Sequence, residues 1–343
     1  MTVRGLPASL ATALARLGVT AALTLFGLLL VTFLIARVVP VDPVLAVVGD
    51  RASTAVYARV RAEMGLDRPL AVQFGRYLAT VARGDLGRSA LTRNKVTTDI
   101  RRFFPATIEL ASVATLLGLV LGVPMGVIAA ARHNRWPDQL LRILSLFGYS
   151  VPVFWLGLMA LLLFYARLGW VAGPGRLDPW LAGLVPARTG LLLVDAALAG
   201  NGAVLRSALA HLVLPAAVLG YYSLAYISRM TRSLMLDQLG QDYILVARAK
   251  GLSESRVLWR HAFGNILVPL LTVVTLAYAS LLEGSVLTET VFAWPGIGSY
   301  ITRSLLNLDM NAVLGGTLAV GAVFILLNLL VESAYRRLDP RLR

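Results

Sequence analysis

Few residues in this chain of 343 amino acids could carry catalytic chemistry. It has no cysteine, three histidines and only two lysines, Lys95 and Lys250. The lack of cysteine excludes disulfides, thiol catalysis and cysteine-bound metals, and three histidines give little basis for a histidine-built metal site. Neither lysine follows the Gly-x-x-x-x-Gly spacing of a phosphate-binding loop, so we expect the chain to have no ATPase site of its own.

The segment best suited to contact another protein is 242–252. Asp242 suits a helix N-cap, Lys250 suits the last turn, where a cation complements the helix dipole, and Gly251 suits the stop position. These signals predict a short helix outside any apolar run, and Ser253 is predicted to cap a second helix that leads into the next such run. A short helix with small side chains can enter a groove of a partner. The alternative is an ordinary amphipathic loop at a membrane surface.

The composition places this segment in a membrane protein. Hydrophobic residues make up 57% of the chain and charged residues 15%, whereas soluble proteins have roughly 45–50% and about 25%. Six stretches without Asp, Glu, Lys or Arg are 20 to 24 residues long, and about 20 apolar residues cross the hydrocarbon of a bilayer. We therefore predict an all-α polytopic protein with six transmembrane helices. These lie between Arg16 and Arg37, Glu109 and Arg132, Arg142 and Arg167, Arg206 and Arg229, Arg260 and Glu283, and Asp309 and Glu332.

The distribution of charge predicts the orientation. With both termini in the cytoplasm, the cytoplasmic segments hold 15 Lys and Arg residues and the two shorter outer segments hold 4, as the positive-inside rule requires. The net charge of +14 thus indicates arginine-rich cytoplasmic loops and not nucleic-acid binding. The first apolar run could instead be a signal peptide, but it is longer than such a region usually is and 37–40 is a poor cleavage site, so we predict a retained span.

These assignments divide the chain into four regions. They are the N-terminus and first helix over 1–40, an extracytoplasmic segment over 41–105, a five-helix core over 106–335 with a cytoplasmic loop at 230–262, and a cytoplasmic tail over 336–343. The weaker apolar stretch at 191–205 contains an acid and two glycines, and we interpret it as a short interfacial or external segment.

The extracytoplasmic segment is predicted to be helical. Ser53 can cap a helix over 55–64, and Gly65 can end it. A second helix is predicted from 67–70 to 84–87, with its apolar stripe formed by Val72, Phe74, Tyr77, Leu78 and Val81. Two interpretations stay open: a small cap packed on the helical bundle, or a docking surface for an extracytoplasmic partner.

Four predicted spans contain a proline, namely Pro124, Pro152, Pro215 and Pro269. Proline removes a backbone hydrogen bond, and the freed carbonyl must face protein or water within a bilayer. Kinked helices are therefore compatible with a pathway for a polar solute, although plain packing is the alternative. No predicted span has an acid or a base at its centre, which argues against an ion-coupled or proton-coupled carrier.

The loop at 242–252, followed by 260–262 and Pro269, resembles the coupling motif of binding-protein-dependent ABC importer permeases. It is similar to the dipeptide/oligopeptide/nickel branch, and the long segment after the first span resembles the first permease of the pair. It departs from the general pattern at Leu245, Val246 and Gly264, where Glu, Ala and Pro are usual. Further segments that resemble this branch, in order, are 42–43, 65–70, 84–89, 106–111, 150–157, 211–216 and 289–298.

The resemblance implies the type I ABC importer permease fold and the transport of dipeptides or oligopeptides across the bacterial inner membrane. It implies a second homologous permease, two ATPase subunits that bind ATP and Mg, and an extracytoplasmic solute-binding protein as partners, besides membrane lipid. The chain itself would bind no cofactor. Three alternatives stay open: the same machinery for nickel or another small solute, a secondary carrier without an ATPase, and a membrane scaffold that transports nothing.

The resemblance also assigns roles to residues. The helix ended by Gly251 would enter a cleft of the ATPase, so bulk at Ala247 or Gly251 should be harmful, and Arg248 and Lys250 could pair with acids there. Residues expected to couple to the ATPase are Asp242, Tyr243, Leu245, Val246, Ala247, Arg248, Ala249, Lys250, Gly251 and Leu252. Residues expected in the pathway or gate are Pro152, Trp155, Pro215, Pro269, Glu283, Glu289, Phe292 and Trp294, with a surface acid as the alternative for Glu283.

Overall fold

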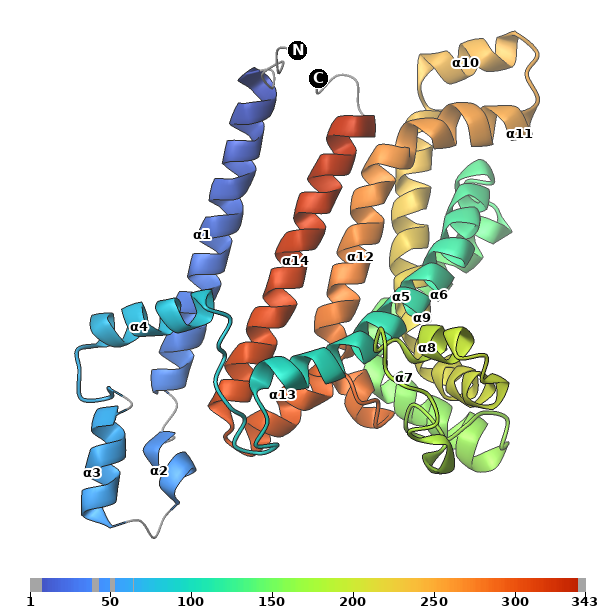
Figure 1. The fold of residues 1–343 in the computed structure, drawn as a ribbon. Coiled ribbons are helices and arrows are strands. Elements are labelled where there is room, and N and C mark those ends of the chain that lie inside the picture. Colours follow the sequence, from blue (N-terminus) through green and yellow to red (C-terminus); the bar gives the residue numbers. More distant parts are fainter. Residues whose placement is uncertain (1–7, 39–42, 50–52, 64, 339–343) are drawn as a thin grey trace. The chain divides into compact units, whose positions relative to one another are not determined.

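The computed structural model describes residues 8–38, 43–49, 53–63 and 65–338. These residues form helices and connecting segments, and they contain no strand beyond one isolated antiparallel bridge between Arg88 and Lys95 (Figure 1). The prediction of an all-α protein is therefore confirmed. The chain divides into two compact units, one made of 1–101 with 300–329 and the other of 102–299 with 330–343.

The first unit begins with the long helix α1 (Ala8–Val38) and continues through α2 (Pro43–Val48), α3 (Thr54–Glu63) and α4 (Leu70–Ala82). The predicted signals operate as expected: the Ser53 hydroxyl accepts a hydrogen bond from the N–H of Val56 at 3.4 Å, and Gly65 follows α3 with φ of +67°. Left-handed backbone of this kind favours glycine because it lacks a Cβ. Both helices predicted within 41–105 are thus present.

Helix α4 packs on α1 through aromatic rings. The ring of Phe74 lies 5.8 Å from that of Phe26 and 5.2 Å from that of Phe33, and Tyr77 lies 5.7 Å from Phe33. Both α4 residues belong to the predicted apolar stripe. Aromatic pairs at these distances add to the free energy gained by apolar burial, which explains why the segment folds onto the first span.

The first unit also contains the start of α5 (Val96–Ala131), most of α13 (Ile297–Leu306) and much of α14 (Met310–Leu338). Two buried acids connect these parts. Asp309 accepts hydrogen bonds from the Ser89 hydroxyl at 2.5 Å and the Leu91 N–H at 3.1 Å, and Asp99 accepts one from the Tyr300 hydroxyl at 3.2 Å. Residues far apart in the sequence are therefore joined by buried polar contacts.

The second unit is built around α9 (Gly202–Leu239) and the continuous helical stretch of α11 (Glu254–Arg256), η3 (Val257–Ala262) and α12 (Phe263–Val291). The remaining elements are α6 (Trp136–Ser150), α7 (Val153–Ala160), η1 (Leu161–Arg167), η2 (Pro179–Leu181), α8 (Leu192–Leu198) and α10 (Asp242–Ala249). Helix α8 lies within 191–205, the stretch interpreted from the sequence as a short interfacial or external segment, and α9 begins inside the same stretch.

A stripe of glycines brings α5 close to α9. A Cβ on Gly122 would lie 3.2 Å from the carbonyl oxygen of Leu224, and one on Gly126 would lie 2.6 Å from that of Ser228. Gly118 meets the backbone of Leu224 in the same way, one turn earlier. Small residues four apart let two membrane helices approach closely, so this stripe, which our sequence reading did not single out, sets the distance between the two helices.

The third predicted span is not one continuous helix, and the count of six spans stays a prediction. Among the residues that the structure describes, five helices are long and apolar enough to cross a membrane, or six if α6 and the stretch 153–167 count as one span, and these two are bent by 98°. Val151 at the break is extended, with φ of −93° and ψ of 124°, and Pro152 follows it. Proline disfavours helical backbone in the residue before it. Pro124, Pro215 and Pro269 instead lie inside helices that continue through them.

Candidate functional site

Helix α10 is the first candidate site, and it forms where the sequence predicted it. Its N-cap is Gln241, with extended backbone at φ of −84° and ψ of 149°, and Asp242 is the first helical residue. The prediction of Asp242 as the N-cap is therefore wrong by one position. An acid in the first turn still interacts favourably with the positive end of the helix dipole. Ser253 is at the N-cap position of α11, as predicted, although its side chain makes no capping hydrogen bond.

The end of α10 is set by a glycine. Lys250 is the C-cap, and Gly251 has φ of +76°. The N–H of Gly251 donates to the carbonyl of Arg248 at 2.9 Å, and the N–H of Leu252 donates to the carbonyl of Ala247 at 3.3 Å. This pair of bonds is the Schellman arrangement, which satisfies carbonyls at a helix end. The predicted stop at Gly251 is thus confirmed.

The two faces of α10 differ. Ile244 and Ala247 are buried in a core shared with α5, α9, η3 and α12. Leu245 and Val246 are 60% and 51% exposed, and Ala249 is exposed beside them. In Figure 1, α10 lies alongside α11 and the end of the long helix that continues as α12. The helix therefore attaches to its own chain by one face and presents apolar side chains on the other.

The charged residues Arg248 and Lys250 are both exposed, but only Arg248 has an ion pair with another residue that the structure describes. Arg248 makes two hydrogen bonds to Glu254 of α11, from Nε at 2.8 Å and from an Nη at 3.2 Å. Lys250 and Gly251 are exposed, and a Cβ on Gly251 would meet open space. A larger side chain at Ala247 would collide with the core in which this residue is buried. At Gly251 a larger side chain would instead be strained by the left-handed backbone. Tyr243 is half-buried, and its hydroxyl donates to Gln238 at 2.8 Å.

The second candidate site is a pocket in the second unit, of about 350 Å³. It lies where α7 begins, beside the middle of α9 and the second half of α12. Its lining is apolar apart from hydroxyl groups and backbone, with Pro152, Val153, Phe154, Leu219, Tyr222 and Thr288 among its residues. The break at Pro152 therefore helps to form a cavity between three helices.

The other residues predicted to lie in the pathway differ in burial. Trp155, Pro269 and Glu283 are exposed, whereas Pro215 is buried.

Glu289 is fully buried, although it lies only six residues after the exposed Glu283. It accepts hydrogen bonds from the Thr107 hydroxyl at 2.6 Å, the Ser285 hydroxyl at 3.1 Å and the Ser299 N–H at 2.8 Å. A buried carboxylate is costly unless donors surround it. Here it connects α5 and α12 to the start of α13.

The turn that follows α12 is fixed by this carboxylate. A Cβ on Gly296 would collide with the Glu289 carboxyl group, so only glycine fits there. At the predicted tight turn, the N–H of Gly296 donates to the carbonyl of Trp294 at 2.8 Å. The Trp294 ring is buried, with its Nε1 donating to the carbonyl of Ala106 at 2.9 Å, and Phe292 is buried against α9. The structure thus brings Glu289, Phe292 and Trp294 together in a core and leaves Glu283 and Trp155 on the surface.

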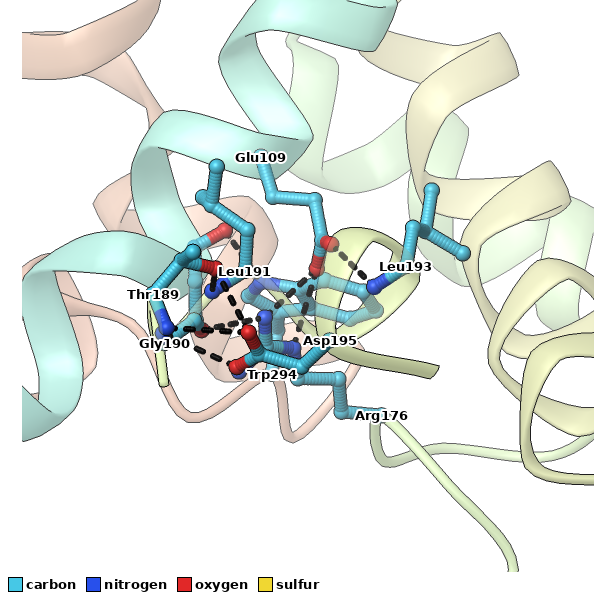
Figure 2. Close-up of polar contacts among 9 residues, drawn as sticks. Glu109, Arg176, Thr189, Gly190, Leu191, Leu193, Asp195 and Trp294 are labelled. Atoms are coloured by element: carbon cyan, nitrogen blue, oxygen red, sulfur yellow. Dashed lines mark hydrogen bonds and ion pairs between the residues drawn. The ribbon is translucent and has the colours of Figure 1, made fainter. Parts of the chain in front are cut away.

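A second buried acid, Glu109, was missed by the sequence reading (Figure 2). It accepts hydrogen bonds from Nε and an Nη of Arg176, at 3.1 and 2.6 Å, and from the N–H of Leu193 at 2.8 Å. Arg176 also donates to the carbonyl of Gly190 at 3.0 Å and stacks 5.8 Å from the ring of Trp294. The sequence did contain a signal for Glu109. It is the only acid among the residues that bound the first three predicted spans, whereas the other five boundaries are arginines.

Asp195 of α8 binds the segment that precedes this helix, and Figure 2 shows it beside Thr189 and Gly190. Its carboxylate accepts hydrogen bonds from the N–H and hydroxyl of Thr189, at 2.9 and 2.8 Å, and from the N–H of Gly190 at 3.0 Å. Burial alone would raise the pKa of Asp195, but these hydrogen bonds outweigh it and lower the pKa below the usual value. The acid that interrupts the apolar stretch at 191–205 therefore organises this segment.

Across the residues that the structure describes, no group of three or more His, Asp or Glu side chains could hold a metal ion. The buried acids are occupied by hydrogen-bond donors of the chain itself. What the geometry offers is an exposed apolar helix and a pocket between helices.

Comparison with known proteins gives consistent matches along the chain. Residues 122–343 match the family described as "Binding-protein-dependent transport system inner membrane component", and residues 11–111 match the N-terminal part of such membrane components. The probable D,D-dipeptide transport system permease protein DdpB of Escherichia coli K12 is 46% identical over 93% of this chain and 94% of its own length. The di/tripeptide transport system permease protein DppB of Pseudomonas aeruginosa UCBPP-PA14 is 42% identical, over 93% of this chain and 95% of its own.

A third relative, the dipeptide transport system permease protein DppB of Alkalihalophilus pseudofirmus, is 39% identical over 93% of this chain and 95% of its own length. Among solved structures, one of the inward-facing MetNI methionine ABC transporter aligns with 68% of this chain and 93% of its own. Its TM-score is 0.49 at 16% sequence identity.

Proposed function

Because the chain belongs to the family of binding-protein-dependent transport system inner membrane components, we propose that it forms half of the pathway by which an ABC importer takes up dipeptides and oligopeptides. The observation that carries the solute class is the identity of 46%, 42% and 39% to three permeases whose names specify dipeptides or di- and tripeptides. The chain is a multi-pass permease subunit of the bacterial inner membrane, and separate ATPase subunits hydrolyse ATP.

The assembly proposed around it has a second homologous permease, two ATPase subunits that hold ATP and Mg, and an extracytoplasmic solute-binding protein. Both termini and the loop with α10 lie in the cytoplasm, in agreement with the bias of arginine. The segment 41–105 lies on the opposite side, where α3 and α4 are available to a partner. Nickel or another small solute is not favoured, because the named relatives transport peptides and no metal cluster occurs in the part of the chain that the structure describes.

Helix α10 is the proposed contact with an ATPase. Its exposed face of Leu245, Val246 and Ala249 offers apolar area to a cleft, and its buried face of Ile244 and Ala247 attaches it to η3 and α12. Because α11, η3 and α12 follow one another without a break, a displacement of α10 would pass directly into the helix that borders the pocket. Transport then follows from two arrangements of the helices whose populations depend on nucleotide and on binding protein.

The pocket at the start of α7 is the part of this chain that we assign to the pathway. Pro152 lines the pocket, and the helices α7, α9 and α12 that form it contain Trp155, Pro215, Pro269 and Glu283. Glu289, Phe292 and Trp294 would shape the outer gate from within the core that holds the turn after α12. An exposed acid such as Glu283 suits the amino terminus of a peptide.

Uptake of a labelled dipeptide by cells that express the complete transporter tests the function. Gly251→Trp should abolish uptake while the protein still reaches the membrane, because the side chain is strained at positive φ and projects from the end of α10. Gly251→Asn is the matched control, since asparagine accepts left-handed backbone, and it should retain most of the uptake. Uptake that is unchanged in the tryptophan variant would exclude the coupling role, and affinity purification in mild detergent would show which subunits accompany the chain.

A further inference from the structure

A basic pocket of about 330 Å³ lies between α6 and α9, apart from both sites described above. Three arginines line it: Arg142 comes from α6, and Arg229 and Arg232 come from α9. The rest of its wall includes Ser145, Leu146 and Tyr149. A pocket in a membrane protein that combines three guanidinium groups with apolar walls needs an explanation, because charge is costly near hydrocarbon.

The arginines are only partly compensated. Asp138 is fully buried and accepts hydrogen bonds from Nε and an Nη of Arg232, the latter at 2.9 Å, and from an Nη of Arg142 at 3.1 Å. Among the residues that the structure describes, no carboxylate lies within ion-pair distance of Arg229. One carboxylate therefore faces three guanidinium groups, and the pocket keeps a positive charge.

Arg229 is held in a way that leaves it able to bind an anion. Its guanidinium carbon lies 4.3 Å from the centre of the Tyr149 ring, which is a cation–π distance. A guanidinium group carries five N–H donors, more than its contact with one tyrosine can use. A phosphate or carboxylate is the partner that these donors fit.

Ser145 gives an independent observation at the same place. Its side chain is buried, with 5% of its surface exposed, and its hydroxyl has no hydrogen-bond partner. Buried hydroxyl groups are nearly always paired. Because Ser145 lines the pocket beside the arginines, a bound oxyanion would supply the missing partner.

The surface next to the pocket favours hydrocarbon chains. Leu146, in the pocket wall, is 66% exposed, and Leu140, Ile143 and Phe147 of the same helix are also exposed. An anionic group in the pocket could therefore be attached to an apolar tail that follows α6. A free inorganic anion has no apolar part that could contact these exposed side chains of α6.

The depth of the pocket agrees with the headgroup layer. Helix α9 has 38 residues, about 57 Å at 1.5 Å per residue, whereas a bilayer with its headgroups is about 40–45 Å thick. Even at a tilt of about 40°, α9 is longer than the hydrocarbon core of about 30 Å, so at least one of its ends reaches the headgroup layer. Arg229 and Arg232 lie in the last third of α9, close to the end that continues into α10.

We propose that the pocket between α6 and α9 binds the phosphate of an anionic phospholipid in the leaflet next to α10. Arg229 and Ser145 would contact the phosphate, Arg142 would add charge, and the exposed residues of α6 would contact the acyl chains. The inference depends on the membrane orientation proposed above, and it does not depend on which solute is transported.

Native mass spectrometry of the intact transporter tests this. After the protein is stripped of lipid in detergent, phosphatidylglycerol and phosphatidylethanolamine with identical acyl chains are added in equal amounts. We expect preferential retention of phosphatidylglycerol, and Arg229→Gln should reduce that retention by about fivefold, the usual effect of one basic residue at an anionic surface. Ser145→Ala should reduce it less. Arg260→Gln, which removes an exposed arginine outside the pocket, is the matched control and should reduce retention clearly less than Arg229→Gln does.

Three results would overturn the proposal. They are equal retention of the two lipids, equal effects of the Arg229 and Arg260 variants, and displacement of phosphatidylglycerol by inorganic phosphate alone, which would indicate a site for free anions. Dipeptide uptake is measured on the same preparations after reconstitution. Lipid preference without dipeptide transport would contradict only the proposed solute, whereas transport without lipid preference would contradict only the lipid site.

Discussion

The two ends of the helical stretch from α11 to α12 are held by different forces. At one end, α10 attaches through the apolar contacts of Ile244 and Ala247 and through an exposed ion pair between Arg248 and Glu254. At the other end, the turn after α12 is fixed by the buried carboxylate of Glu289. Apolar contacts are not directional, whereas a buried carboxylate with several donors permits essentially one arrangement.

This difference suits the proposed transport cycle. An end that must follow a moving ATPase benefits from contacts that can slide or tilt at low cost. An end that must keep its shape while the pathway opens and closes benefits from directional hydrogen bonds. Within the stretch from α11 to α12, the buried carboxylate therefore lies at the end away from α10.

Removal of the Glu289 carboxylate is the strongest test of the rigid end. In Glu289→Ala, the Ser299 N–H and the hydroxyls of Thr107 and Ser285 lose their acceptor, and each buried unpaired group costs about 1–3 kcal/mol. We expect a loss of about 3 kcal/mol or more, measured as a large fall in thermal stability in detergent. Glu283→Ala is the control, because that acid is exposed on the same helix, and it should keep normal stability. Equal stability of the two variants would contradict the assigned role of Glu289.

The packing of the same turn predicts a smaller effect of one added methyl group. The Cβ of Gly296→Ala would collide with the Glu289 carboxyl group, and overpacking of this kind costs typically 1–3 kcal/mol. Gly264→Ala is the matched substitution on α12, at a helical position where a Cβ meets open space, and it should be neutral or slightly stabilising. Thermal unfolding of both variants checks the difference, and a Gly296 variant as stable as the control would show that the turn can adjust.

The two alanines of α10 separate attachment from coupling. Ala247 is buried and Ala249 is exposed, so tryptophan at 247 should lower stability, whereas Ala249→Trp should leave stability unchanged. If the exposed face enters an ATPase, Ala249→Trp should reduce dipeptide uptake at least about tenfold, which corresponds to about 1.4 kcal/mol. Uptake and thermal stability of both variants are the measurements. Normal uptake in Ala249→Trp would place the contact with the ATPase elsewhere.

Local signals explain which features the sequence could predict. The helices at 54–63, 70–82 and 242–249 follow from capping residues, glycine stops and apolar periodicity, which act within a few residues. Five of the six spans follow from apolar length alone. The break within the third predicted span also has a local cause, since Val151 before Pro152 is extended, but hydropathy does not distinguish a kinked helix from a broken one.

The buried polar contacts could not be predicted in this way. Glu289 meets Thr107 across 182 positions, and Glu109 meets Arg176 across 67. No spacing rule connects residues so far apart, because only the folded arrangement of helices brings them together. A single sequence therefore identified Glu289 as noteworthy without revealing that its donors come from three elements.

The ion pair of Arg248 and Glu254 predicts the smallest effect on stability. Both side chains are largely exposed, at 40% and 62%, so the loss of the pair should cost no more than about 0.5 kcal/mol. If the pair acts only within the chain, Arg248→Ala and Glu254→Ala should change dipeptide uptake equally and slightly. If Arg248 also contacts an acid of the ATPase, Arg248→Ala should reduce uptake more than Glu254→Ala does. A double variant distinguishes the two cases. If the pair acts only within the chain, both single variants and the double variant should have the same uptake. If the arginine acts on a partner, the double variant should match Arg248→Ala and fall below Glu254→Ala.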